Sequence, residues 1–366
     1  MKELEFLKII QQTLSKNTHI GDDCAHLKDL GIVVTHDSLV EDIHFCTKYS
    51  TPYQIGYKSI MVNLSDIFAS GAVPKYFTIS LSLPKNTTGK FVKEFYKAVE
   101  DLSKEFDFEV IGGDITGSDK IFVSVCAIGL TKGRNISSRS HAKAGDYVIT
   151  TGVHGSSAAQ LFLLKETGGK AKCKMQNEKC ILAEKLKRCP SLALCRAKPD
   201  QMSGFARGGP KSLISREGIL FPFHFYLFPS FNHLLTLKKL SSDISTKIKR
   251  DYAMMDTSDG LADALFKIAQ ASNITISVDF DKIPYDKEIE NIAQMAKIDF
   301  KDWIFYGGED FQLIACIDAE NLEQLSSDSY TIIGTVKKKS DNFVEIIFDN
   351  KVTTINNLKK TFNHFN

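Results

Sequence analysis

Several sequence features that identify common protein classes are missing from this chain. It contains neither a G-x-x-x-x-G-K-[ST] motif nor a G-x-G-x-x-G motif, so both familiar glycine-rich phosphate loops are absent. The formal net charge is only +2, with 46 basic and 44 acidic residues. This balance excludes a global field that would attract nucleic acid or an anionic membrane. Binding partners must therefore be inferred from local sites, and we expect neither a nucleic acid nor a membrane among them.

Long apolar segments are also missing. The longest, ILFPFHFYLFPSF at residues 219–231, is too short to cross a bilayer and contains two prolines. The first residues, MKELEFLKII, include acidic side chains where a secretory signal has its apolar segment. We therefore expect a cytoplasmic protein.

Cysteine is scattered, and no C-x-x-C pair occurs among the eight cysteines. Four of them fall within residues 173–195, but their spacings match no common structural zinc pattern. Free thiols in a reducing compartment are therefore favoured over a zinc site.

The length of 366 residues and the hydrophobic content of 43% suit about two globular domains. Residues 31–131 predict the order strand, helix, strand, helix, strand, strand, with the first strand ending at His36 and Asp37. This order indicates a layer with helices on one face of a sheet. A new strand, turn and helix follow near residue 140, and residues 252–336 again alternate strands and helices. We predict a mixed α/β (α+β) protein with an N-terminal domain at 1–138 and a C-terminal α/β domain at 139–366.

Residues 170–250 are atypical, because their aromatic and proline content fits neither a helical nor a strand period. Within them, residues 221–233 are mostly aromatic residues, prolines, histidines and leucine. Because such a surface is rarely left exposed to water, we expect this segment to pack onto the C-terminal domain, with a dimer contact as the second choice.

Acidic residues recur beside glycines and apolar runs along the chain. The segments are IGDDCA (20–25), THDSLVED (35–42), NLSDI (63–67), IGGDI (111–115), AMMDTSDGLADAL (253–265) and YGGEDF (306–311). Any one of them is more often a turn or a helix cap than a ligand loop. Several together favour a site where carboxylates hold Mg²⁺ ions against a polyphosphate, since hard cations prefer oxygen ligands.

These motifs, in this order and spacing, resemble thiamine-monophosphate kinase, a member of the superfamily that includes aminoimidazole ribonucleotide synthetase and selenophosphate synthetase. The resemblance rests on GDDCAHL, HDSLVEDIHF, MVNLSDIFASGA, IGGDITGS, GRNISSRSHAKAGDYVITTGVHG, MDTSDGLADAL and YGGEDFQL. It implies ATP-dependent phosphorylation of thiamine monophosphate to thiamine diphosphate. It also implies a homodimer whose N-terminal domains bind ATP and Mg²⁺ and pair through their sheets.

The resemblance implies roles for individual residues. The implied magnesium ligands are Asp23, Thr35, Asp37, Asp66, Asp114, Asp256 and Asp259. The implied ATP contacts are Gly113, Asp114, Arg139 and Ser258, and the residues implied to take part most directly in catalysis are Asp114, Arg139 and Asp259. The implied thiamine contacts are His44, Glu309 and Phe362.

Two alternatives stay open at this level. One is another ATP-dependent enzyme of the same superfamily, although Cys24 lies inside the acidic motif rather than in the glycine-rich loop that selenophosphate synthetase would need. The other is a protein that binds nucleotide and magnesium without turnover. Nucleotide binding without ADP release on addition of thiamine monophosphate would indicate the second alternative.

Overall fold

The computed structural model describes residues 3–16, 19–166 and 231–358, which all belong to one compact unit. Among these residues, no helix combines the length and the apolar character needed to cross a bilayer. The cysteines at 173–195 and most of the aromatic segment at 221–233 lie outside the described residues, as does Phe362. The predictions for those segments remain predictions.

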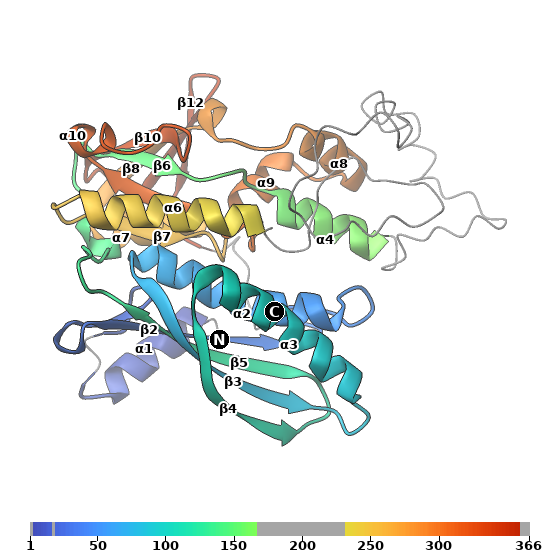
Figure 1. Cartoon of the computed structure of the whole chain (residues 1–366). Coiled ribbons are helices and arrows are strands. Elements are labelled where there is room, and N and C mark those ends of the chain that lie inside the picture. The colour runs from blue at the N-terminus through green and yellow to red at the C-terminus, as the bar shows by residue number, and fades with distance from the viewer. Residues whose placement is uncertain (1–2, 17–18, 167–230, 359–366) are drawn as a thin grey trace, which may run out of the picture. The chain divides into compact units, whose positions relative to one another are not determined.

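Five strands in the order β1-β2-β5-β3-β4 make the first sheet (Figure 1). β3 pairs with β4 in parallel, and the other neighbours pair antiparallel. Two long helices pack on one face of this sheet, which confirms the predicted layer and its element order. The elements are β1 (Ala25–Leu27), β2 (Ile32–Val40), α2 (Pro52–Ser70), β3 (Val73–Leu83), α3 (Gly89–Phe106), β4 (Glu109–Gly117) and β5 (Phe122–Leu130), preceded by α1 (Glu3–Thr13).

Both ends of α2 follow from the sequence. Thr51 and Gln54 form a reciprocal capping box at its start, where Pro52 occupies the first turn. Gly71 ends the helix with a φ of 87°, a conformation that favours glycine. A side chain at this position would also collide with the Tyr252 hydroxyl. The position of α2 is therefore fixed precisely, which matters because α2 carries site residues.

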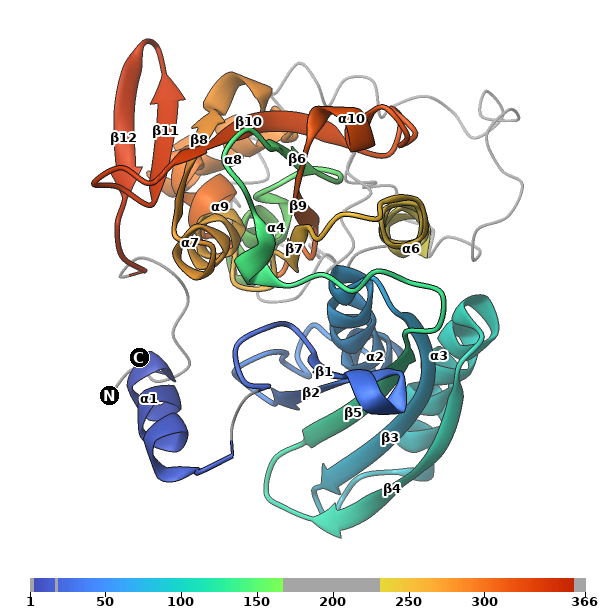
Figure 2. The same ribbon diagram turned by 90° about the vertical axis from the view of Figure 1, so that its left-hand side faces the viewer.

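The second sheet has seven strands in the order β12-β11-β8-β10-β6-β9-β7 (Figure 2). Its strands are β6 (Tyr147–Thr150), β7 (Ala253–Asp256), β8 (Ile274–Asp279), β9 (Leu313–Ile317), β10 (Thr331–Lys338), β11 (Val344–Phe348) and β12 (Lys351–Ile355). Its helices are α4 (Ser156–Glu166), α6 (Phe231–Lys247), α7 (Leu261–Ala271), α8 (Glu288–Ala296), α9 (Phe300–Tyr306) and the short α10 (Ala319–Leu322). Single 3₁₀ turns are η1 (Lys28–Leu30), η2 (Arg139–His141) and η5 (Phe280–Lys282).

α6 joins the two sheets into one core. Its buried residues Leu234, Leu237, Leu240 and Ile244 recur at helical spacing and belong to the same apolar cluster as α2 and as strands of both sheets. The sequence predicted no firm element here. The start of α6 also meets the end of the aromatic segment, where His233 Nε2 lies 2.9 Å from the carbonyl oxygen of Phe311.

The expectation that β2 would end at His36 and Asp37 is wrong. β2 continues to Val40 because Leu39 is also buried and because every residue from 32 to 40 pairs with β5. Asp37 therefore lies inside a strand rather than at its end. Asp66 likewise lies inside α2, and Asp114 lies inside β4, whereas Asp256 is the last residue of its strand, as expected.

Candidate active site

α2 places Asp66 beside β2 and the segment that precedes β1. Asp66 Oδ2 accepts a hydrogen bond from Thr35 Oγ1 at 2.5 Å, and its carbonyl oxygen accepts one from Cys24 Sγ at 3.4 Å. Thr35 is buried and lies on the face of β2 that α2 covers. The packing of the helix on the sheet thus determines where the Asp66 carboxylate lies.

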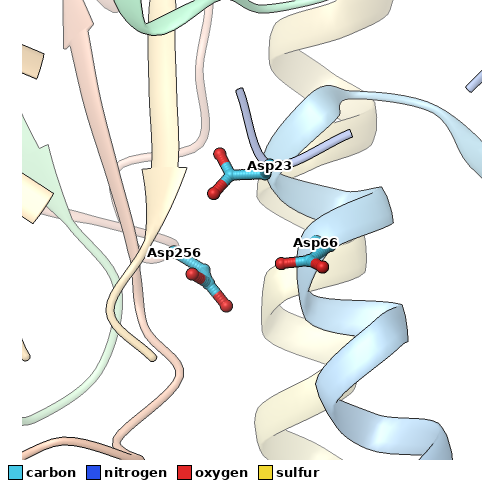
Figure 3. Close-up of side chains that lie close together, drawn as sticks. All are labelled: Asp23, Asp66 and Asp256. Atoms are coloured by element: carbon cyan, nitrogen blue, oxygen red, sulfur yellow. The ribbon is translucent and has the colours of Figure 1, made fainter. Parts of the chain in front are cut away.

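Three carboxylates converge on one point (Figure 3). One oxygen of each of Asp23, Asp66 and Asp256 lies within 4.8 Å of the other two. They come from the segment before β1, from α2 and from the end of β7. Ser65 Oγ orients Asp256 by donating to its Oδ2 at 2.6 Å. The cluster therefore joins elements of both sheets.

This arrangement is electrostatically costly without a cation. Burial raises the pKa of Asp66 well above its usual value, and the neighbouring carboxylates Asp37, Asp256 and Asp23 raise it further. Burial first and Asp23 second raise the pKa of Asp256 to about 7. A divalent cation held by oxygen ligands would remove this repulsion, so the residues present fit a magnesium site.

Asp37 and Asp259 border the cluster. Burial raises the pKa of Asp37, while a hydrogen bond with Asp66 opposes this effect, and Asp259 and Asp23 lie close enough to raise it again. Asp259 Oδ2 lies 3.3 Å from Lys267 Nζ. The structure thus brings six of the seven predicted ligands together, namely Asp23, Thr35, Asp37, Asp66, Asp256 and Asp259.

Arg139 contacts the cluster through its guanidinium group. Its Nη2 donates to Asp23 Oδ1 at 2.7 Å, and its Nη1 donates to the carbonyl oxygen of Gly21 at 3.1 Å. The Asp23 side chain is only 6% exposed, so this ion pair is shielded from water. Arg139 therefore supplies positive charge directly beside the carboxylates.

Ser258 lies beside Asp256 and connects the cluster to a second loop. Its Oγ donates to Asp256 Oδ1 at 3.0 Å, and its carbonyl oxygen accepts from the Glu309 backbone N–H at 2.7 Å. α7 begins only at Leu261, so Ser258 stands in the turn before the helix rather than at its first residue.

Gly113 and Asp114 lie away from the cluster. The cross-strand register aligns Gly113 with Ile79, Val125 and Asp37, three strands away, which corresponds to about 14 Å. Asp114 aligns with Ser80, Ser124 and Ser38, so its side chain is on the sheet face opposite the one that α2 covers. In β4 both residues are exposed. A single chain therefore does not bring them to the cluster.

A cavity of about 890 Å³ connects the carboxylates with two of the predicted thiamine contacts. Asp37, Asp66, Asp256 and Asp259 line it together with His44 and Glu309. Its apolar and aromatic lining includes Tyr49, Leu161, Trp303, Tyr306 and Phe311. If cations neutralise the carboxylates, a ligand with an anionic end and a ring system would suit such a cavity.

His44 and Glu309 are each held by contacts of the fold. The backbone N–H of Val40 donates to His44 Nδ1 at 3.0 Å, which leaves the proton of a neutral ring on Nε2. Glu309 Oε1 lies 2.5 Å from the buried Lys58 Nζ.

The sequence interpretation missed Lys58, Ser65 and Lys267. Lys58 was detectable, because it precedes Asp66 by eight positions and so shares a helix face with it. Lys267 lies one helical turn after Asp263 in α7 and pairs both with Asp263 and with Asp259, which precedes the helix.

Comparison with known proteins shows which family this chain belongs to. Residues 21–131 match the family described as AIR synthase related protein, N-terminal domain. Thiamine-monophosphate kinase of Bacillus subtilis is 30% identical over 96% of this chain and 94% of its own length. The chain belongs to the thiamine-monophosphate kinase family. The enzyme of the same name from Pyrococcus horikoshii is also 30% identical, over 94% of this chain and 91% of its own length.

Solved structures agree with this membership. A complex of AaThiL with AMPPCP and TMP has a TM-score of 0.71 and 27% identity, and covers 100% of this chain and 97% of the other. The thiamine monophosphate kinase of Aquifex aeolicus has a TM-score of 0.66 and 26% identity, covering 96% and 99%. A hydrogenase-maturation complex of HypE and HypF, at 18% identity and a TM-score of 0.65, shares the fold.

Proposed function

We propose that this chain transfers the γ-phosphoryl group of ATP to thiamine monophosphate and so forms thiamine diphosphate. The observation that carries the proposal is the cavity that connects Asp66 and Asp256, two members of the carboxylate cluster, with His44 and Glu309. Family membership supports it, as does the solved relative bound to an ATP analogue and TMP.

Magnesium is part of the proposal. Asp23, Asp66 and Asp256 would hold the ion, with Asp37, Asp259 and Thr35 at its border. Bound Mg²⁺ would neutralise the phosphate oxygens and lower the repulsion between the two substrates. Arg139, whose Nη1 and Nη2 donate to Gly21 and Asp23, would add positive charge beside the phosphate oxygens, and Ser258 contributes a hydroxyl beside Asp256.

The transfer requires no general base from the chain. A phosphate monoester has its second pKa near 6, so the attacking oxygen is already anionic at neutral pH. We propose in-line attack of this oxygen on the γ-phosphorus of ATP. The role of the chain is then to orient the two phosphates and to exclude water, which is supported by the burial of Asp256 and by the low exposure of the Asp23 side chain beside Arg139.

The thiamine end is assigned to the part of the cavity with His44 and Glu309. The thiazolium ring carries a positive charge, which the Glu309 carboxylate complements, and the aromatic lining offers surfaces for stacking. Phe362 remains a predicted contact outside the described residues.

We expect substitutions of His44 or Glu309 by alanine to impair mainly the use of thiamine monophosphate. Loss of one hydrogen bond to a charged group corresponds to about tenfold to one hundredfold in affinity. Separate titrations with ATP and with thiamine monophosphate measure the two effects, and ATP affinity should change by less than about twofold. An equal loss for both ligands would show that the two ends of the cavity are assigned wrongly.

A homodimer completes the proposed site. β4 is an edge strand with exposed Ile111 (51%) and Ile115 (67%), which suits a surface covered by a second copy. If the sheets of two chains pair, Gly113 and Asp114 of one chain can reach the cluster of the other. This arrangement reconciles their predicted role with their position far from the cluster of their own chain.

A coupled assay of ADP release tests the proposed function. With Mg²⁺ and ATP present, thiamine monophosphate should start ADP release, whereas thiamine without a phosphate group should not. Binding of nucleotide without ADP release would instead support a binding protein that lacks turnover. Release that depends on a different acceptor would support another enzyme of the superfamily. We also propose that the reaction takes place in the cytoplasm.

A further inference from the structure

Lys58 is a buried cation in the wall of the cavity. It lies in the middle of α2, is 1% exposed and is among the largest fully buried side chains of the described residues. It lines the same cavity as His44 and Glu309. A lysine ammonium is costly to bury without partners, so its contacts explain its presence there.

The Lys58 ammonium connects the two described residues that are assigned to thiamine. Its Nζ donates to the carbonyl oxygen of His44 at 2.6 Å and lies 2.5 Å from Glu309 Oε1. His44 belongs to the turn between β2 and α2, while Glu309 belongs to the loop before β9. One ammonium group thus holds two segments that are distant in sequence.

The backbone of the Glu309 loop is fixed independently of Lys58. The Glu309 N–H donates to the Ser258 carbonyl oxygen at 2.7 Å, and its own carbonyl oxygen accepts from Ser157 Oγ at 2.7 Å. The next residue, Asp310, accepts from the backbone N–H groups of Gly155 and Ser157 at the start of α4. These contacts fix the loop even though Glu309 has a φ of 69°.

The Glu309 side chain depends on Lys58 in a way that the backbone does not. This side chain is 40% exposed, so water competes for its carboxylate. A carboxylate that lost the Lys58 ammonium could rotate toward solvent, because the backbone contacts do not restrain its χ angles. Lys58 therefore selects the side-chain orientation that faces the cavity.

We propose that Lys58 is a positioning residue for thiamine monophosphate, which acts by holding Glu309 and the His44 turn in their binding arrangement. The inference rests on the proposed function, since it concerns the same cavity. The contact uses Glu309 Oε1, which leaves Oε2 as the oxygen for the thiazolium end of the substrate.

Lys58→Met tests the inference with little risk to folding. Methionine keeps an unbranched chain in the buried position, and the Glu309 carboxylate left behind can be solvated because it is partly exposed. The matched control is Lys104→Met, which removes an exposed lysine of α3 that pairs with Glu100. Thermal unfolding of both variants checks that the fold is retained.

The decisive readout is a double-mutant cycle with Glu309→Gln, measured as calorimetric binding of thiamine monophosphate to the full chain. Lys58→Met should weaken binding about tenfold to one hundredfold, while ATP binding and the Lys104→Met control stay within about twofold. In the Glu309→Gln background, Lys58→Met should weaken binding by clearly less than it does in the unaltered chain, because one of the two groups that it positions is already altered and only the contact with the His44 carbonyl oxygen remains.

The other outcomes separate failure of the inference from failure of the proposed function. Unchanged binding by Lys58→Met, or fully additive effects in the cycle, would show that Lys58 does not act through Glu309. Equal loss of ATP and thiamine monophosphate binding would show a general structural role. If the unaltered chain binds thiamine monophosphate without releasing ADP, the proposed function fails while the Lys58 result still stands. If it does not bind thiamine monophosphate, both are overturned.

Discussion

Replacing Asp66 with asparagine is expected to lower phosphoryl transfer by more than about 100-fold. Asparagine keeps the shape of the side chain and its hydrogen bond with Thr35 Oγ1, but it removes one of the three charges that converge at the cluster. Changes in groups that only support a metal ligand already cost about 10–100-fold in affinity or activity, so a ligand itself should exceed that range. ATP titrations with and without Mg²⁺ measure the effect on binding.

In the absence of metal, the same substitution should stabilise the fold, although it lowers activity. The pKa of Asp256 is raised from 3.8 to about 7, so between these values the folded chain binds more protons than the unfolded chain. Stability without Mg²⁺ should therefore fall as the pH rises through this window, and Mg²⁺ should restore it. Asp66→Asn removes one interacting charge, so it should reduce both the fall and the restoration.

Asp101→Asn is the matched control, since this carboxylate lies on α3 and pairs with Lys97. It should leave the Mg²⁺ dependence of ATP binding unchanged. If Asp66→Asn and the unaltered chain bind ATP equally well with and without Mg²⁺, the proposed metal site is wrong.

Two variants that are each inactive on their own are expected to regain phosphoryl transfer when one chain of each forms a mixed dimer. Asp66→Asn disables the cluster, and Asp114→Asn disables the group that we assign to the site of the partner chain. In a mixed dimer, one site then combines an intact cluster with an intact Asp114, while the other site carries both changes. Activity should rise from near zero to about half that of an unaltered dimer with the same number of chains.

Co-expression with two different affinity tags and sequential purification would isolate the mixed dimer. Each variant purified alone provides the baseline, and Asp66→Asn mixed with itself controls for the tags. A mixed dimer that stays as inactive as its parents, with Asp114→Asn inactive on its own, would place Asp114 in the site of its own chain. A chain that remains monomeric at assay concentration would overturn the homodimer.

The sequence predicts the local structure of this protein better than it predicts distances across its sheets. The strand and helix order through residue 131 could be derived from hydrophobic periods and from the signals around α2, such as Gly71. The separation of Asp114 from Asp37 could not be derived, because it depends on strand order and register. α6 also escaped prediction, since its stripe of leucines follows an aromatic segment with no clear period.

The candidate site shows the same contrast. The motif resemblance singled out Asp23, Asp66 and Asp256, which the fold then brings within one ion's reach from three separate elements. Lys58 was overlooked because lysine side chains are usually solvent-exposed, and only the packing around α2 shows that this one is buried. Its helical spacing to Asp66 was the available signal.

The central claim is that Asp23, Asp66 and Asp256 together hold the metal that accompanies ATP. Anomalous diffraction from crystals grown with Mn²⁺ and a non-hydrolysable ATP analogue tests it most directly, because Mn²⁺ accepts the same oxygen ligands as Mg²⁺. The account predicts an anomalous peak about 2.1 Å from an oxygen of each of the three carboxylates, beside the phosphates of the analogue. Bound nucleotide with no peak among these carboxylates, or with every peak at other residues, would contradict it.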